Sequence, residues 1–498
     1  MKSRITIVCF ALWVFLAVSY VSAQTPAYHA NVLGISDGRT NIQVEAPKGM
    51  NRWGQVIGTF GGGTSGGTHA ALWTPATAND GTGEGISGAG TLFSIESSPG
   101  LPAGTANSWA YGLNDRGQIA GMSYTPGKGD GNQLQSWMWK PTTLNSTKGV
   151  LHGTSGSAVT FPLVYVSSLF ESSAEYIPSI NNHGTIAATA FGAVPLLWTP
   201  TTANGTAGIW TYDATYHAQT TAINDAGQIA GMTCNSLSVV GPFLHNGGLP
   251  LLPGDFIASS LWLPGNTVCN TDSIGLNALG HMAISAVNTA NLQQAYLYKN
   301  GTVKDISSGV YSVASAINSH DQVVGYVITD TTRASLFYGG KVVDLNTVND
   351  SINGLHLVHP VAINNAGQIL VTGTYPGGTG ATVLLQPNAM VFSPVSVTKG
   401  PMQINGTTYS QTVTVTNKGT AAITGPISVA LDGLTAGVTL TKKTGTTVYS
   451  GPGSAYVNVS SSELQPGATT AAFTLVFSDP SLKTINYTPR VLGSAAPR

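Results

Sequence analysis

Residues that could catalyse a reaction are few and scattered in this sequence. Only 21 of the 498 residues are Asp or Glu, and 10 are His. They form no paired-carboxylate motif and no His, Cys and Asp cluster at the spacing of a metal site. No His-Glu-x-x-His helix or phosphate-binding loop occurs either. We therefore predict no catalytic residue, no metal and no cofactor, and we favour a binding protein over an enzyme.

Aromatic and polar side chains offer chemistry for binding instead. Five residues before each Asn of a repeated motif, described below, the sequence varies and is mostly aromatic or polar. Such groups suit a neutral polar ligand such as a glycan. The alternative interpretation is relaxed constraint where a strand meets a loop. The candidate ligand-binding residues, with Trp262 added from the long segment 253–272, are Trp109, Tyr176, Gln219, Trp262, Asp272 and His359.

The repeated motif occurs seven times and organises most of the chain. Each copy has a small residue, a large aliphatic residue, Asn, two variable residues, usually Gly, and then usually Gln, as in GLNDRGQIAG and AINDAGQIAG. Spacings of 41 to 67 residues between copies indicate a propeller or another repeat array. The anchoring residues are Asn51, Asn114, Asn181, Asn224, Asn277, Asn318 and Asn364.

The chemistry of the motif is that of a β-hairpin. Asn ends one strand, where its side chain can bond backbone groups of the turn. Gly three residues later supplies the positive φ that a short hairpin needs. The sixth copy has Asp321 at that place, and Asp is one of the few residue types tolerated there. We interpret the repeated Asn and Gln residues as structural; the alternative is that they bind a ligand.

A second strand follows each hairpin, as in HAALWTP and PLLWTP, and tight turns then lead into a further strand in the later copies. Trp73, Trp139 and Trp198 occupy the same place in it, so we expect them in the core. Each repeat thus holds four short antiparallel strands, which is a propeller blade. The large and small residues before each Asn would let neighbouring sheets interdigitate.

A strand count indicates how the ring closes. The last repeat ends at Ala381–Gln386 and lacks its fourth strand, whereas His29–Ile35 is a spare strand ahead of the first repeat. Pairing the two would remove both exposed edges. A frame in which each blade begins with that fourth strand needs no such exchange, and the sequence leaves it open.

The pattern resembles the HAF family of extracellular repeat proteins, whose units combine an Ile-Asn-x-x-Gly-Gln-Val-x-Gly hairpin with a His-Ala-Phe-Leu-Trp strand. The closest copy of the second element is His69-Ala70-Ala71-Leu72-Trp73, while the other six copies are degenerate. The resemblance covers residues 28–387 and implies an exported propeller-like module. It implies no catalytic residues.

After Pro387 the repeat stops. About 100 residues with six or seven alternating strands, including Ser410–Thr416 and Thr470–Phe477, are typical of an immunoglobulin-like sandwich. We therefore predict an all-β chain, a seven-bladed β-propeller (residues 24–390) followed by an immunoglobulin-like β-sandwich (residues 391–498).

The N-terminus predicts export. A basic start, the apolar run Ile5–Tyr20 and the small residues ending at Ala23 are typical of a signal peptide, here cleaved after Ala23. We expect a secreted or cell-surface protein with no transmembrane segment in its mature form. Cys234 and Cys269 are then the remaining cysteines, and we predict a disulfide between them.

The composition of the chain limits the classes of molecule that it can bind. Charged residues make up 8% of the chain and its net charge is −1, which excludes a basic surface for nucleic acid. We expect a monomeric, non-enzymatic surface or matrix protein that binds a glycan or another protein; the alternative is a propeller-type polysaccharide hydrolase or lyase. Because the opposite loops vary more than the Asn-Gly hairpins, we expect binding on the face away from those hairpins.

Overall fold

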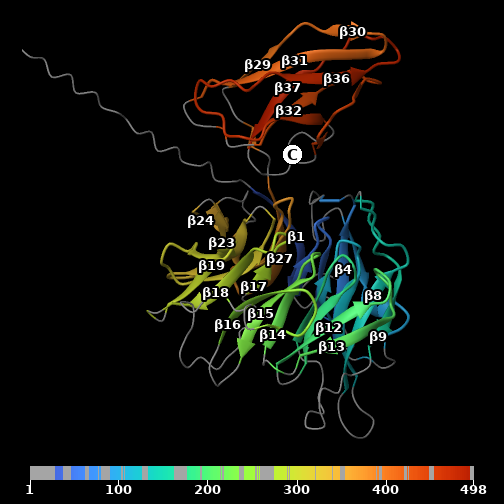
Figure 1. Ribbon diagram of the computed structural model, residues 1–498, viewed down its shortest axis with the longest axis vertical. Coiled ribbons are helices and arrows are strands. Elements are labelled where there is room, and N and C mark those ends of the chain that lie inside the picture. The colour runs from blue at the N-terminus through green and yellow to red at the C-terminus, as the bar shows by residue number, and fades with distance from the viewer. Residues whose placement is uncertain are drawn as a thin grey trace, which may run out of the picture. The chain divides into compact units, whose positions relative to one another are not determined.

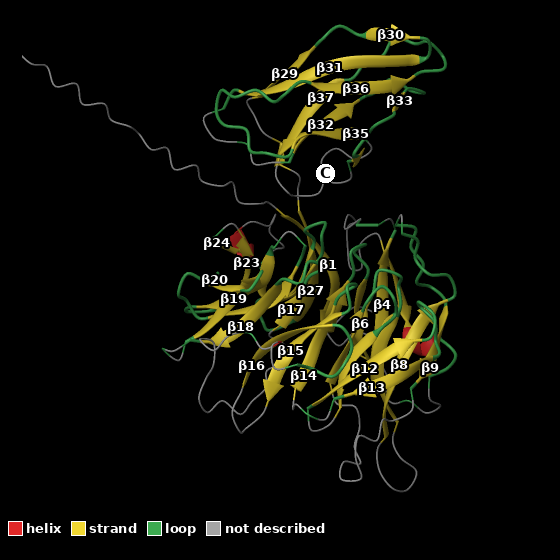
Figure 2. Ribbon diagram, in the orientation of Figure 1, coloured by secondary structure: helices red, strands yellow, loops and turns green. Residues whose placement is uncertain are grey.

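The computed structural model describes residues 28–493 with gaps, the longest of which span 37–45, 80–89, 162–175 and 258–273. The described residues form two compact units, one of residues 28–390 and the other of residues 391–446 and 454–493. Both are built of β-strands (Figure 2), and helix is limited among the described residues to 3-10 turns such as η1 (Ile95–Ser97) and η5 (Leu345–Thr347). The predicted all-β class is confirmed. Within the described residues, no helix has the length and apolarity to cross a membrane.

The first unit contains seven small antiparallel sheets, numbered here as repeat sheets 1 to 7 in chain order (Figure 1). In the described part of the chain, sheet 4 has three strands and the others have four. Sheets 1 to 3 consist of β2 (Ala46–Met50), β3 (Val56–Gly61), β4 (Thr68–Pro75) and β5 (Gly90–Ser94); β6 (Asn107–Leu113), β7 (Ile119–Thr125), β8 (Gln133–Pro141) and β9 (Gly156–Thr160); and β10 (Tyr176–Ile180), β11 (Ile186–Ala190), β12 (Val194–Pro200) and β13 (Gly208–Tyr212). Sheets 4 to 7 consist of β14 (Ala218–Ile223), β15 (Gln228–Cys234) and β16 (Val240–Asn246); β17 (Ile274–Leu276), β18 (Met282–Val287), β19 (Gln293–Lys299) and β20 (Thr302–Asp305); β21 (Ser312–Ile317), β22 (Val323–Ile328), β23 (Thr332–Tyr338) and β24 (Lys341–Asp344); and β25 (His356–Ile363), β26 (Ile369–Thr374), β27 (Gly380–Pro387) and β1 (Tyr28–Ser36).

Each motif Asn ends the first strand of its sheet and organises the hairpin that follows. In repeat 2, Asn114 Oδ1 accepts hydrogen bonds from the backbone N–H groups of Arg116 (3.1 Å) and Gln118 (2.9 Å). Three residues after the Asn, the six Gly residues have φ between 77° and 85°, and Asp321 has a φ of 58°. The predicted left-handed turn position is confirmed in all seven copies.

The same Asn side chains also link the sheets into a closed ring. Each Asn donates from Nδ2 to the backbone carbonyl oxygen of the Asn in the next repeat. The seven distances, from the Asn51–Asn114 link round to the Asn364–Asn51 link, are 3.1, 2.8, 3.1, 3.0, 3.0, 3.0 and 3.4 Å. The structural interpretation of the repeated Asn residues is thus confirmed, because every one is buried and bonded on both sides.

The first and last strands of the repeat region lie side by side (Figure 1). β1 pairs antiparallel with β27, with His29 opposite Gln386 and Ile35 opposite Ala381. This is the predicted pairing, and it decides between the two frames left open by the sequence. The fourth strand of sheet 7 comes from the N-terminal side of the chain.

Packing between sheets follows the large and small positions before each Asn. Trp73, Trp139 and Trp198 are 1%, 0% and 2% exposed, as expected for core residues.

The small residue two positions before each Asn permits close approach of neighbouring first strands. A Cβ on Gly275 would lie 3.1 Å from Cα of Ala316 in the next sheet.

One pair of substitutions between repeats 5 and 6 is matched. In repeats 1 and 5, the missing side chain of the turn Gly makes room for the Gln of the preceding repeat. A Cβ on Gly54 or Gly280 would lie 2.7 Å from Oε1 of Gln368 or Gln228. Repeat 6 has Asp321 at the Gly position, and repeat 5 has His281 in place of Gln. His281 Nδ1 lies 2.6 Å from Asp321 Oδ1, which also accepts a bond from Asn277 Nδ2 (3.2 Å). Where the motif has Gln, that Gln accepts the hydrogen bond from Nδ2 of the Asn in its own repeat. In repeat 5 the acceptor is instead Asp321, which belongs to the next repeat.

The Asp321 carboxylate has a further partner in Lys299, whose Nζ lies 2.7 Å from Oδ2. Burial of this carboxylate raises its pKa, but hydrogen bonds from Lys299 and His281 outweigh that effect and leave the pKa below its usual value. The resulting stabilisation is present above the unfolded pKa of an Asp and is lost as the pH falls through the lower folded value.

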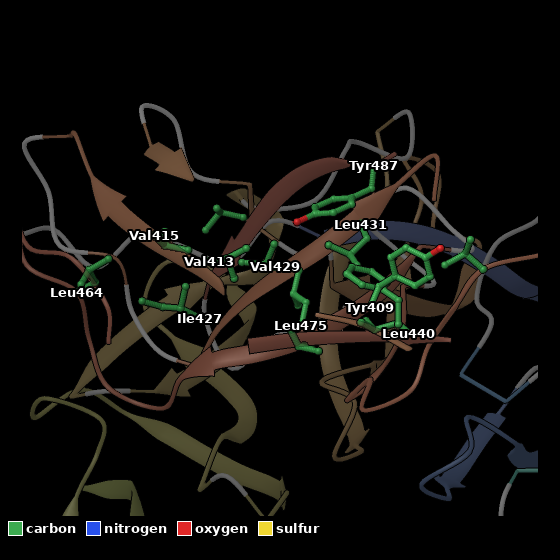
Figure 3. Close-up of a cluster of buried hydrophobic side chains, with 14 of the residues drawn as sticks. Tyr409, Val413, Val415, Ile427, Val429, Leu431, Leu440, Leu464, Leu475 and Tyr487 are labelled. Carbon is green, nitrogen blue, oxygen red and sulfur yellow. The ribbon is translucent and has the colours of Figure 1, made fainter. Parts of the chain in front are cut away.

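The second unit has two antiparallel sheets with a shared apolar core (Figure 3). Burial alternates along its strand Thr408–Asn417. Arg490 Nε and Nη2 form a bidentate ion pair with Asp432, at 2.6 and 2.8 Å. Side chains such as Val413, Val429 and Leu475 point between the sheets (Figure 3). The sheets are β28 (Met390–Val391), β37 (Thr488–Gly493), β32 (Ile427–Asp432), β35 (Ala455–Ser460) and β34 (Gly445–Thr446); and β29 (Val395–Lys399), β31 (Thr408–Asn417), β36 (Phe473–Ser478) and β33 (Thr439–Leu440), with β30 (Gln403–Asn405) on β31.

The closing strand gives a first prediction. A chain beginning at residue 41 should melt at a clearly lower temperature than one beginning at residue 24, because β27 loses its partner and the buried Tyr28 and Leu33 are removed. Leu33→Ala is a milder version and should cost about 2–5 kcal/mol. Thermal unfolding measures both. A truncated chain that melts like the intact one would contradict closure by β1.

The matched pair gives a second prediction, measured as a double-mutant cycle in urea. His281→Gln crowds Asp321, and Asp321→Gly leaves His281 and Asn277 short of an acceptor, so each should cost about 1–3 kcal/mol. The double variant restores the pattern of the other repeats and should be more stable than the sum of the two predicts, by about 0.5–3 kcal/mol. Additive losses would show that the two residues act independently.

Candidate functional site

The residues that the sequence singled out for binding lie at equivalent places, at the end of each first strand away from the Asn. In the hairpins, Trp109 pairs with Met122, and Gln219 pairs with Met232. Tyr176 and His359 hold the same register in β10 and β25. Trp262 and Asp272 lie outside the described residues.

These residues have different surroundings. Trp109 is half-buried, whereas Gln219 is 7% exposed and its Oε1 has no hydrogen-bond partner. His359 is exposed and packs edge-on against Tyr326, with ring centroids 4.8 Å apart, and partial desolvation lowers its pKa. Among the described atoms, no hydrogen bond or ring contact joins Trp109, Gln219 and His359 to one another. Binding at this end of the strands stays a prediction.

A hollow of about 230 Å³ lies at the other end, where the seven Asn residues meet. It is lined by three consecutive residues from every repeat: the large aliphatic residue, the Asn and the residue after it. The aliphatic positions, interpreted from the sequence as core, therefore also line this hollow. They are Met50, Leu113, Ile180, Ile223, Leu276, Ile317 and Ile363.

The Asn side chains that line the hollow have little capacity left for a ligand. In repeat 2, Asn114 Nδ2 donates to Gln118 Oε1 (2.9 Å) and to the carbonyl oxygen of Asn181, while its Oδ1 accepts the two turn bonds. The amide therefore uses both hydrogens and both lone-pair directions within the protein. Binding groups must come from the residues beside these Asn residues.

The residues after the seven Asn form a polar collar around the hollow. In four places the backbone N–H of one collar residue donates to a side-chain oxygen of the next. The donor–acceptor pairs are Arg52 to Asp115 (2.9 Å), Asp115 to Asn182 (2.7 Å), Asn182 to Asp225 (2.8 Å) and Ser319 to Asn365 (2.8 Å). The collar residues are Arg52, Asp115, Asn182, Asp225, Ala278, Ser319 and Asn365.

Two carboxylates of the collar are held close together by one amide. Asn182 Nδ2 donates to Asp115 Oδ2 and to Asp225 Oδ2, at 2.7 Å each, so these oxygens are no further apart than twice that distance. Arg52 Nε donates to Asp115 Oδ2 at 2.6 Å. All four carboxylate oxygens accept at least one hydrogen bond from the collar. The pair joins repeats 2, 3 and 4 and presents its remaining lone pairs at the rim.

A β-bulge in most of the first strands is a feature that the sequence did not reveal. The register shifts at Lys48, Tyr111 and Thr221, each three residues before its Asn. Lys48 Nζ lies 5.9 Å from the centre of the Tyr111 ring, and burial raises the pKa of that Tyr. The residues at these three positions are Lys, Tyr and Thr, so no single residue type marks the bulge in the sequence.

The predicted disulfide and the expected absence of a metal site concern residues of which the structure describes only a part. Cys234 is the last residue of β15, but Cys269 lies outside the described residues. The bridge therefore stays a prediction. No group of three or more His, Cys, Asp or Glu residues is placed to hold a metal ion in the part of the chain that the structure describes.

No protein-family model and no curated protein matches the sequence. Solved structures match weakly. An acylaminoacyl peptidase from Pyrococcus horikoshii is 9% identical with a TM-score of 0.40, over 78% of this chain and 58% of the peptidase. A Trypanosoma rangeli sialidase is 8% identical with a TM-score of 0.33, over 95% of this chain and 92% of the sialidase. At these values neither likeness says anything about activity.

The collar gives a third prediction. The backbone N–H of Asp225 faces Ala278, which has no acceptor, so Ala278→Asn should copy the Asp115–Asn182 link and add hydrogen bonds worth about 1 kcal/mol. The melting temperature should rise. Ala226→Asn, one residue further along the same hairpin as Asp225, is the matched control and should leave it unchanged. Equal effects of the two variants would contradict the collar geometry.

Proposed function

We propose that the first unit is a seven-bladed β-propeller and the second an immunoglobulin-like module, in a chain exported by residues 1–23. The seven small sheets, the closed ring of Asn links and the pairing of β1 with β27 support the propeller. The two packed sheets of residues 391–493 support the module. The basic and apolar N-terminus supports export to the cell surface or beyond.

We propose further that the protein is a non-enzymatic recognition protein that binds an extracellular glycan or surface protein. The observation that carries this proposal is the hollow of about 230 Å³, to which every repeat contributes an aliphatic residue and every repeat but the fifth a polar residue at the rim. A concave site with apolar walls and a few placed polar groups is the usual form of a ligand site. The proposed site lies on the hairpin face, opposite to the face expected from loop variability.

A polysaccharide hydrolase is the second candidate, and the Asp115–Asp225 pair favours it. Paired carboxylates at such a separation are what glycoside hydrolysis needs. Against it, both carboxylates are tied to Asn182 and Asp115 also to Arg52. This arrangement suits a fixed hydrogen-bonding surface better than an acid that must give up and regain a proton.

A glycan array with the mature chain tests the proposal and defines the face. Ala278→Trp should fill the hollow and weaken binding at least tenfold, whereas Ala226→Trp on the neighbouring hairpin tip should not. Trp109→Ala tests the opposite end of the channel and should leave binding intact. Loss of binding in Trp109→Ala but not in Ala278→Trp would place the site at that end. Release of reducing ends from a bound polysaccharide would favour the hydrolase.

A further inference from the structure

The collar is incomplete at three of its seven junctions. Where the next residue carries a side-chain oxygen in reach, the backbone N–H of the preceding collar residue is bonded to it. At the other junctions the structure gives no acceptor, among the described residues, to the backbone N–H groups of Asp225, Ala278 and Asn365. The residues that follow them round the ring are Ala278, Ser319 and Arg52.

The junction between Asn365 and Arg52 differs from the other two in its charge. Arg52 carries no acceptor, so it cannot satisfy the Asn365 N–H. Its Nε is bonded to Asp115, and its guanidinium carbon lies 5.1 Å from the centre of the Trp53 ring. Its terminal nitrogens have no hydrogen-bond partner among the described residues, and the side chain is 47% exposed. Asn365, with its unsatisfied backbone donor, and Arg52, with its exposed guanidinium, are neighbours in the collar and both line the hollow.

The neighbouring junction, between Arg52 and Asp115, shows which chemical group can satisfy a backbone N–H and a guanidinium together. Asp115 accepts the backbone N–H of Arg52 through Oδ1 and its Nε through Oδ2, at 2.9 and 2.6 Å. A carboxylate is therefore the group that the collar itself uses to satisfy one backbone donor and one guanidinium together. At the Asn365 junction the next collar residue is Arg52, which brings a guanidinium and no carboxylate.

Resting on the proposed recognition function, we propose that the hollow binds a sugar carrying a carboxylate, a uronic acid, with that carboxylate between Asn365 and Arg52. One carboxylate oxygen accepts the Asn365 N–H, and the other accepts from the terminal nitrogens of Arg52, a charge-assisted contact. Further round the collar from Arg52, the Asp115 and Asp225 oxygens accept sugar hydroxyls with their remaining lone pairs. These acceptors favour a polyhydroxylated ligand over a peptide carboxylate, and the Arg52 contact replaces the neutral preference expected from the sequence.

Ligand-observed NMR titration of the full mature chain with three small probes tests this inference. The probes are galacturonic acid, galactose, which lacks the carboxylate, and N-acetylglycine, which has a carboxylate but no hydroxyls. Galacturonic acid should bind at least tenfold more tightly than either of the others. Equal binding of galactose, or binding only of other neutral sugars, overturns the carboxylate assignment and leaves the recognition function standing. Equal binding of N-acetylglycine overturns the assignment to a sugar.

Substitution of Arg52 tests where the carboxylate of the sugar binds. Arg52→Gln should reduce the preference for galacturonic acid over galactose to threefold or less. Arg116→Gln, at the tip of the next hairpin and outside the lining of the hollow, is the matched control and should keep the full preference. An unchanged preference in Arg52→Gln overturns the proposed position. A wild-type chain that binds none of these probes, and no glycan on an array, contradicts the recognition function itself.

Discussion

The bond from each motif Asn to the next one is the interaction on which the repeat unit depends. A single side chain caps its own hairpin through Oδ1 and reaches the neighbouring repeat through Nδ2. The local turn and the long-range closure therefore share one buried amide. Because the links run round all seven repeats and return to Asn51, each copy is constrained by both neighbours. A buried amide deprived of these partners would be costly.

This constraint separates positions that must stay alike from positions that can differ. The aliphatic residue, the Asn and the left-handed turn position are fixed by packing and backbone geometry. The residue directly after the Asn lies beside the hollow, and its side chain is not part of the apolar core. Its variation from Arg52 to Asp115 and Ala278 gives a symmetric scaffold an asymmetric rim. Binding specificity, in this view, arises from the collar.

The sequence predicted those features that are local or repeat sevenfold. The hairpins, their Gly positions, the core Trp residues and the register of β1 on β27 follow from patterns within a few residues or from a strand count. The hollow could not be found in this way, because Arg52 and Asp115 are 63 residues apart and meet only when the ring closes. Aligning the repeats at Asn and examining the next column would have given a signal. Trp262, Asp272 and Cys269 lie outside the described residues and stay predictions.

The most direct test of the Asn ring is the unfolding free energy of Asn114→Ala in urea. The substitution removes bonds to Gln118 and Asn181 and two turn bonds within repeat 2. At about 1 kcal/mol for each net hydrogen bond, the loss should reach about 3 kcal/mol or more. A loss of about 0.5 kcal/mol or less, typical of a surface substitution, would contradict the claim that these Asn side chains hold the ring together.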